Sequence, residues 1–477
     1  MASPSSSLAT SAGRLSGRAW GALLVLCGAL FLDALDVSMT GVALPSIRHD
    51  LHMSTSSLQW VVSAYVLGYG GFLLLGGRAA DLLGRRRMFL ISLGVFVVAS
   101  ALGGLANDGT LLIATRFIKG VSAAFTAPAG LSIITTNFAE GPARNKALSI
   151  YTATGATGWS LGLVFSGLLT EIGWRWVFFL PAPFAFATLI GAVALVPTDS
   201  RIAHAVRRFD VAGAVTITAA MLLLVFTVVE APDQGWGSPR TLGSFAIAAA
   251  ILATFVAIER RSEAPLVRLG ILRSGMLVRA NLGAMALLGS WFGFQFMLTL
   301  YLQQARDWTA LETGLALFPA GLLVATLAPR VAPLVNRFGV TRVIVAGLSS
   351  MVAAYALFLP IGLDSGYVVA MLPTFILAGL AFGLAYGPLN IAATNGVAPE
   401  EQGLAGGLVN TSFQFGGALV LAIVTAVANA NGLADGTAQG LLDGFHAAIW
   451  VSLGAALLGV VAMALPVRER AVAIEAA

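Results

Sequence analysis

Long apolar runs recur along almost the whole chain, and they limit its fold more than any other feature. A membrane-spanning helix needs about 20 apolar residues. Fourteen runs of roughly that length lie near residues 20–45, 57–77, 88–106, 110–135, 147–170, 176–196, 211–230, 241–258, 280–303, 313–335, 342–361, 366–393, 403–429 and 444–464. Only 10% of the residues are charged, whereas soluble proteins average about a quarter. We therefore predict an all-α polytopic protein embedded in a lipid bilayer.

The basic residues predict the orientation of these spans, because Lys and Arg collect in cytoplasmic loops. With the N-terminus inside, 21 of the 27 Lys and Arg residues fall on the cytoplasmic side and 4 on the outer side. The other two, Arg116 and Lys119, lie within a span. A twelve-span alternative without residues 211–258 keeps the same parity but leaves about 45 mostly apolar residues in water. We therefore expect fourteen spans with both termini cytoplasmic, and the net charge of +5 then needs no nucleic-acid partner.

Residue types that support enzymatic or metal chemistry are sparse. Cys27 is the only cysteine and lies in an apolar run. The four histidines have no metal-ligand spacing: His49, His52, His204 and His446. No nucleotide-binding loop is present, and among the apolar runs only the first contains paired acids. We expect no catalytic residues, no metal and no cofactor, with a proton gradient as the energy source.

The stretch between the second and third runs combines glycines, one acid and three consecutive arginines. It reads GRAADLLGRRR over residues 77–87, and the arginines predict a short cytoplasmic surface loop. Gly77 and Gly84 would let two helix ends turn and pack closely, and Asp81 could accept hydrogen bonds from Arg85 or Arg86. A plain basic anchoring loop is the alternative.

The pattern G-x-x-x-D-x-x-G-R-R resembles the signature loop between the second and third helices of the major facilitator superfamily. An echo follows 255 residues later in residues 332–342, where Asn336 aligns with Asp81, Gly339 with Gly84 and Arg342 with Arg87. The resemblance implies two six-helix bundles with a substrate site near the membrane midplane between them. Two extra helices explain the long offset, as in the fourteen-helix drug:proton antiporter branch.

These considerations divide the chain into seven segments. They are a disordered cytoplasmic tail (1–19), an N-terminal six-helix bundle (20–196), a cytoplasmic linker (197–210), an inserted helix pair (211–258), a second linker (259–279), a C-terminal six-helix bundle (280–464) and a cytoplasmic tail (465–477).

Two acids lie in the first run. Residues 35–45 read LDVSMTGVALP and resemble the branch's motif L-D-x-T-x-x-N-x-A-L-P, with Asp36 at the family position. Asp33 lies three residues earlier on the same helix face. Acids in a membrane usually serve protons, ions or cationic substrates, and two neighbouring acids favour holding a proton near neutral pH. Alternatively, Asp36 only caps or pairs with another helix. Which acid carries the proton stays open.

Two cations lie in the fourth run. Residues 116–120 read RFIKG and resemble the family's R-x-x-Q-G, whose buried arginine is tied to proton transfer, although Lys119 replaces the Gln. A cation at this depth needs an acid nearby, so Arg116 should pair with Asp33 or Asp36. A purely structural ion pair would look identical, and Lys119 could instead extend to the membrane surface.

Small residues dominate the fifth run. Gly158 and Gly162 have the small-xxx-small spacing that lets helices approach closely, and Gly167 follows. Before the sequence WRW, these glycines resemble the antiporter motif G-x-x-x-G-P-x-x-G-G. Leu163 replaces its proline and Ser166 one glycine, so the expectation of export is weakened but not reversed.

Several polar side chains within the spans could face a substrate cavity. Tyr65 lies in a stretch resembling the family's Q-W-x-x-x-x-Y-x-L. Gln295, Tyr301, Asn410 and Gln414 lie in later runs. Hydrogen bonds between helices, or close helix packing, would account for these residues equally well.

The sequence predicts a monomeric, multi-pass protein of the bacterial inner membrane. The expected function is proton-coupled export, by alternating access, of drugs, antibiotics or other lipophilic small molecules, cationic ones included. The alternatives are a dedicated exporter of one endogenous metabolite or antibiotic, and a transporter-like sensor that binds a ligand without moving it.

Overall fold

Helices make up nearly all of the computed structural model, which describes residues 16–138, 142–198, 210–262, 269–395, 397, 402–433 and 437–465. The α-helices are α1 (Gly17–Asp50), α2 (Thr55–Leu83), α3 (Arg85–Gly104), α4 (Gly109–Asn137), α5 (Pro142–Ile172), α6 (Trp176–Phe179), α7 (Pro181–Leu195), α8 (Val211–Gln234), α9 (Pro239–Glu259), α10 (Gly275–Leu300), α11 (Ala310–Leu327), α12 (Val331–Phe338), α13 (Val340–Phe358), α14 (Leu372–Thr394), α15 (Gln402–Ala430) and α16 (Ala438–Ala464). Short 3-10 or π turns are η1 (Leu269–Arg273), η2 (Tyr301–Ala305), η3 (Ala328–Arg330) and η4 (Tyr367–Met371).

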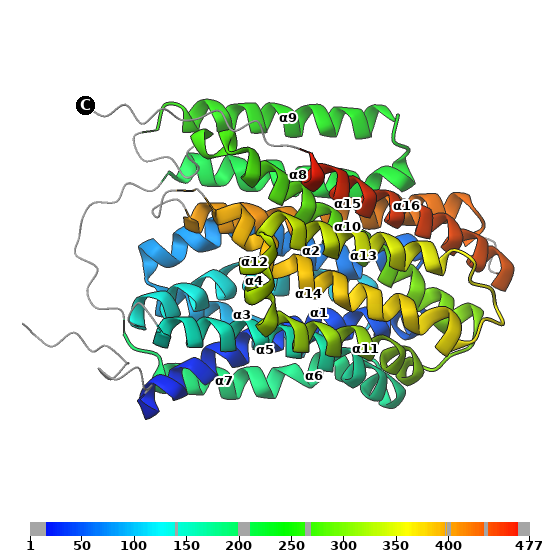
Figure 1. Ribbon diagram of the computed structural model, residues 1–477, viewed down its shortest axis with the longest axis horizontal. Helices are drawn as coiled ribbons and strands as arrows, with labels where there is room; N and C mark the ends of the chain where they lie inside the picture. Colours follow the sequence, from blue (N-terminus) through cyan, green and yellow to red (C-terminus); the bar gives the residue numbers. More distant parts are fainter. Residues whose placement is uncertain are drawn as a thin grey trace, which may run out of the picture.

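Within the described residues, twelve helical stretches are long and apolar enough to cross a membrane. They correspond to every predicted run except the second and the fifth. Those two runs form α2 and α5, of 29 and 31 residues, which pack mainly on α4 and α1 (Figure 1). The all-helical membrane architecture is therefore confirmed, while the count of fourteen spans stays a prediction for α2 and α5.

The helices pack as two groups that meet along two seams. Helices α1 to α7 contact mainly one another, and so do α10 to α16. One seam is formed by α5 against α11, and the other by α2 against α15. The predicted tails and linkers lie partly outside the described residues, which leave out 1–15, 199–209, 263–268 and 466–477.

Helix α8 lies over the α2–α15 seam and contacts both helices, whereas α9 packs mainly on α8 at the edge of the bundle (Figure 1). The Leu222 side chain of α8 fills the space beside Gly71 of α2. Nearer the predicted outer end, the Trp60 indole N–H of α2 donates to Glu230 of α8 at 3.0 Å. The inserted pair is thus joined to both groups of helices on one side of the molecule.

The prediction of a surface loop over residues 77–87 is wrong for most of this stretch, which is helical. Helix α2 continues through Leu83, and α3 begins at Arg85. The chain turns at Gly84 alone, whose φ of +99° is a conformation that favours glycine. Gly339, its aligned counterpart between α12 and α13, has a φ of +84°. The two glycines therefore make the same kind of turn, which supports the internal repeat.

The run predicted over residues 313–335 is also shorter than expected. Helix α11 ends at Leu327, a 3-10 turn follows over Ala328–Arg330, and α12 begins at Val331. Pro329 lies in that turn, and proline lacks the N–H that a continuing helix needs. An apolar run therefore overestimates the span where a proline interrupts it.

Candidate functional site

An ionic cluster lies inside the first group of helices. Asp36 of α1 is 0% exposed and contacts Arg116 and Lys119 of α4, which are 1% and 0% exposed. One Asp36 oxygen accepts from Arg116 Nη1 at 2.5 Å, and the other accepts from the Lys119 ammonium. The cluster pairs one anion with two cations in the buried interior, where removing one partner is strongly unfavourable.

Both cations are fixed by further contacts. Arg116 Nε donates to the Val61 carbonyl of α2 at 3.0 Å. The Lys119 ammonium lies 4.7 Å from the ring centre of Phe96 and 5.4 Å from that of Phe178, so aromatic faces as well as Asp36 stabilise its charge. Lys119 therefore does not extend to the surface. The only sequence signal for the role of Lys119 is its position one helical turn after Arg116.

Asp33 has a different environment from Asp36. It is half-buried, and its carboxylate accepts a hydrogen bond from the Tyr65 hydroxyl at 2.6 Å. The Tyr65 ring in turn lies under the Arg116 guanidinium, 4.6 Å from its carbon. Tyr65 therefore connects the half-buried acid to the fully buried ionic cluster, a connection that the sequence did not reveal.

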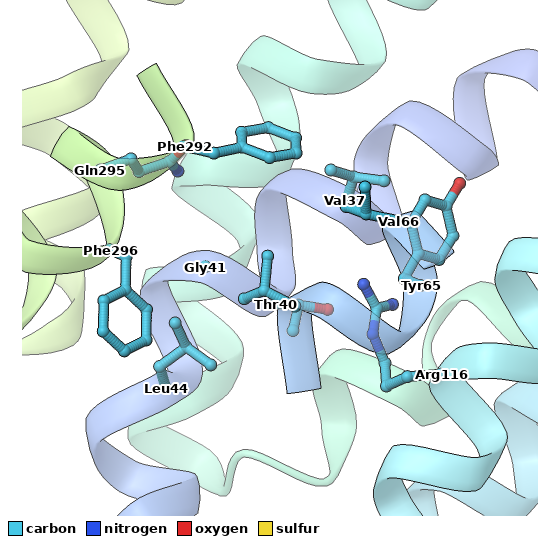
Figure 2. Close-up of a pocket in the computed structure, with 11 residues that line it drawn as sticks. Val37, Thr40, Gly41, Leu44, Tyr65, Val66, Arg116, Phe292, Gln295 and Phe296 are labelled. Carbon is cyan, nitrogen blue, oxygen red and sulfur yellow. The ribbon is translucent and has the colours of Figure 1, made fainter. Parts of the chain in front are cut away.

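A small pocket adjoins this cluster at the boundary between the two groups of helices (Figure 2). Figure 2 shows α1 side chains between α10 and the Tyr65–Arg116 pair; the lining residues are Val37, Thr40, Gly41, Leu44, Val62, Tyr65, Val66, Arg116, Phe292, Gln295 and Phe296. The volume of about 30 Å³ corresponds to about one water molecule, whereas drug-sized pockets measure about 300–1,000 Å³. A substrate could occupy this place only if the two groups of helices separated.

Two of the five residues predicted to face a cavity, Tyr65 and Gln295, line this pocket. Tyr301 does not: it is fully buried, donates to the Gly362 carbonyl at 2.8 Å and stacks on Phe445. Asn410 donates to the Gly406 carbonyl at 2.8 Å within α15. Gln414 lies against Gly70 at the α2–α15 seam. The structure thus gives these three residues packing positions away from this pocket.

The glycines of α5 permit close helix contacts. A Cβ atom at Gly158 would lie 2.5 Å from the Phe31 carbonyl oxygen of α1, and one at Gly162 would overlap Ser38. A Cβ at Gly167 would lie 2.6 Å from Leu311 Cα of α11. Gly158 and Gly162 therefore join α5 to α1, whereas Gly167 joins the two groups of helices.

Ser166 and Leu163, which depart from the α5 motif, both make packing contacts. The Ser166 hydroxyl donates to the Met39 carbonyl of α1 at 2.5 Å. Leu163 is fully buried, and its carbonyl lies where a Cβ at Gly314 of α11 would be. These two residues thus take part in the same close packing that the glycines allow.

Residues predicted to latch the cytoplasmic side make contacts within the first group of helices. Arg85 donates to Thr136 of α4, and Arg86 donates to the Val193 carbonyl of α7 at 2.6 Å. Gly77 packs near Pro128. The Asp81 side chain lies outside the described residues, so its predicted part in the latch stays a prediction.

At the opposite end, predicted to face outward, polar side chains join the two groups of helices. Gln303 of η2 donates to the Val42 carbonyl of α1 at 2.9 Å. Arg48 of α1 donates to Gln304 at 3.2 Å. Together with the contact between Gly167 and Leu311, these bonds hold the predicted outer ends together.

Replacing Gln303 with leucine should loosen this outer closure. Loss of the bond to Val42 removes about 1 kcal/mol, which corresponds to about a fivefold shift toward the outward-open state. Spin labels at the exposed positions 49 and 366, in a Cys27→Ser background, would report a larger population of long distances. Gln439→Leu is the control, because Gln439 bonds Asp443 within α16. Equal distance distributions in both variants would contradict this account.

The structure thus defines a polytopic helical membrane protein with a buried ionic cluster beside the boundary of two helical groups. The Major Facilitator Superfamily model matches residues 26–421, so the chain belongs to that superfamily.

Several curated relatives are named as antibiotic resistance or export proteins. The chain is 38% identical to a puromycin resistance protein of Streptomyces alboniger, over 86% of this chain and 82% of the relative. It is 36% identical to a cephamycin export protein of Amycolatopsis lactamdurans, over 86% and 85%. A tetracenomycin C resistance and export protein of Streptomyces glaucescens is 32% identical, over 88% and 78%.

Solved transporters share the fold. A POT family transporter matches with a TM-score of 0.65 at 17% identity, covering 92% of this chain and 97% of that one. A D-xylose-proton symporter matches with a TM-score of 0.64 at 15% identity, covering 93% and 97%. The family and its structural neighbours identify the protein as a multi-pass membrane transporter rather than an enzyme.

Proposed function

We propose that this protein is a proton-coupled antiporter that exports drugs, antibiotics or other lipophilic small molecules across the bacterial inner membrane as a monomer. The observation that carries the proposal is the buried Asp36–Arg116–Lys119 cluster beside a pocket at the boundary of the two helical groups. Relatives named for antibiotic resistance and export support small-molecule export.

Alternating access supplies the mechanism. The two helical groups rock about the midplane and expose the site to each side in turn. Substrate binds from the cytoplasm while a first-helix acid is ionised. Protonation from outside competes with the substrate or follows its release, and deprotonation inside restores the high-affinity state. Asp33, Asp36 and Arg116 form the coupling group, and Asp81 with Arg85 and Arg86 steadies the cytoplasmic side.

Transport by purified protein in vesicles tests this proposal. Vesicles with an acidic lumen should accumulate ethidium against its gradient, and nigericin, which removes the pH gradient, should release it. Arg116→Gln should abolish this accumulation because Asp36 loses a partner. Arg240→Gln, at the exposed start of α9, is the matched control and should accumulate the dye normally. Uptake that survives nigericin would rule out proton coupling.

A dedicated exporter of one antibiotic is the second candidate, because the names of the puromycin, cephamycin and tetracenomycin C relatives each refer to one kind of antibiotic. Inhibition of ethidium transport by other compounds distinguishes a broad exporter from a dedicated one. A broad exporter would show ethidium transport inhibited by chemically unrelated drugs, whereas a dedicated exporter would respond to one compound and its close analogues.

A further inference from the structure

Two first-helix acids, three residues apart, differ in access and in partners. Asp36 is 0% exposed and touches two cations. Asp33 is half-buried and accepts a hydrogen bond from the neutral Tyr65 hydroxyl. Asp33 therefore keeps partial exposure and one neutral partner, whereas Asp36 can be reached only by displacing Arg116 or Lys119.

The charges around Asp36 also oppose its protonation. Arg116 and Lys119 would then lie side by side in a low-dielectric interior with their contacting anion neutralised. Asp36 contacts both of these cations directly. With Asp33 ionised, the four side chains sum to zero, so Asp33 completes the charge balance of the cluster.

An aromatic pair from α2 adjoins Asp33. The Tyr65 hydroxyl donates to its carboxylate at 2.6 Å, and the Tyr69 ring centre lies 6.0 Å from that of Tyr65. A carboxylate beside aromatic rings is suited to an organic ammonium or another delocalised cation.

We propose that Asp33 is the single exchangeable charge of this transporter, occupied in turn by one proton and by one positive charge of an organic cation, while Arg116 and Lys119 keep Asp36 ionised. This inference rests on the proposed function and deepens it. One proton then leaves for each monovalent cation bound, so the exchange is electroneutral. Lys119 acts as a positioning residue, because it keeps Asp36 out of the exchange.

The first test does not depend on transport. Dicyclohexylcarbodiimide reacts with protonated carboxyl groups in apolar sites, and peptide mass spectrometry locates the product. In the full-length protein in vesicles, the label should appear on Asp33, be absent from Asp36, and be lost when ethidium is present. Asp36 should become labelled in Lys119→Gln. The charge-matched double variant Asp36→Asn/Lys119→Gln should still be labelled at Asp33.

Either of two results would overturn the proposal. Labelling of Asp36 in the unmodified protein would make it the exchanging acid. Labelling of Asp33 that ethidium does not reduce would exclude an organic cation as its alternative occupant.

The second test measures ethidium movement driven separately by a pH gradient and by a membrane potential. Movement into vesicles that carry Asp33→Asn gives the passive background, which is subtracted. Electroneutral exchange predicts movement with the pH gradient alone. Movement driven by the potential would overturn one-for-one exchange. Ethidium-protected labelling of Asp33 without any movement of dye would instead refute the proposed export function while leaving the assignment of Asp33 intact.

Discussion

Asp36→Asn should destabilise the protein more than any other single substitution within the ionic cluster. Asparagine has nearly the same volume but leaves Arg116 and Lys119 buried without their shared anion. Removing one partner of a buried ion pair lowers the free energy of unfolding by about 3–5 kcal/mol. We expect a clearly lower thermal unfolding temperature for the purified protein, and little folded material in the membrane.

The double variant Asp36→Asn/Lys119→Gln is the matched control. It removes one charge of each sign and leaves Arg116 near Asp33, so most of the lost stability should return. An Asp36→Asn protein that unfolds at the parent's temperature would contradict a cluster held together by charge. Equal losses in the single and double variants would indicate that hydrogen-bond geometry, rather than charge balance, is what matters.

Gly314→Val should prevent the predicted outer ends of the two helical groups from closing. A side chain at Gly314 of α11 would overlap the Leu163 carbonyl of α5, and backbone atoms cannot rotate away. Overpacking this tight contact raises the free energy of the closed state by about 1–3 kcal/mol, so the ratio of closed to open protein should fall by about 5- to 160-fold. Spin labels at positions 49 and 366 should report predominantly long distances, and transport should fall in parallel.

Gly454→Val is the control for Gly314→Val. Gly454 lies within α16, and a Cβ atom there would meet nothing within 4 Å. Both changes add the same side chain to a helix interior, so only the contact across the seam differs. A Gly314→Val protein with the parent's distance distribution and transport rate would show that α5 and α11 need not approach closely for function.

Residues in the helices were predictable from the sequence where a local pattern determines their position. Charged residues inside apolar runs were expected to pair with an opposite charge, and Arg116 does form an ion pair with Asp36. Aligned glycines at 84 and 339 predicted equivalent turns, and both have positive φ. Pro329 could likewise have shortened the tenth predicted span, because its effect on a helix is local.

Positions that depend on helix rotation and on contacts between distant helices were not predictable. Gln295 and Tyr301 are six residues apart, which places them on different faces of a helix with 3.6 residues per turn. Gln295 lines the pocket, while Tyr301 packs on Phe445. The Tyr65–Asp33 bond joins α1 to α2, and nothing local to either segment specifies that contact.

The place of α8 makes the two sides of this transporter unequal for a compound dissolved in the surrounding lipid. Helices α5 and α11 meet directly, but the α2–α15 seam is covered by α8, which is packed at Gly71 and bonded through Glu230 to Trp60. A lipid-dissolved compound entering laterally from the bilayer would be blocked by α8 on that side. Any lateral opening between the two helical groups therefore lies between α5 and α11, although the two groups share an internal repeat.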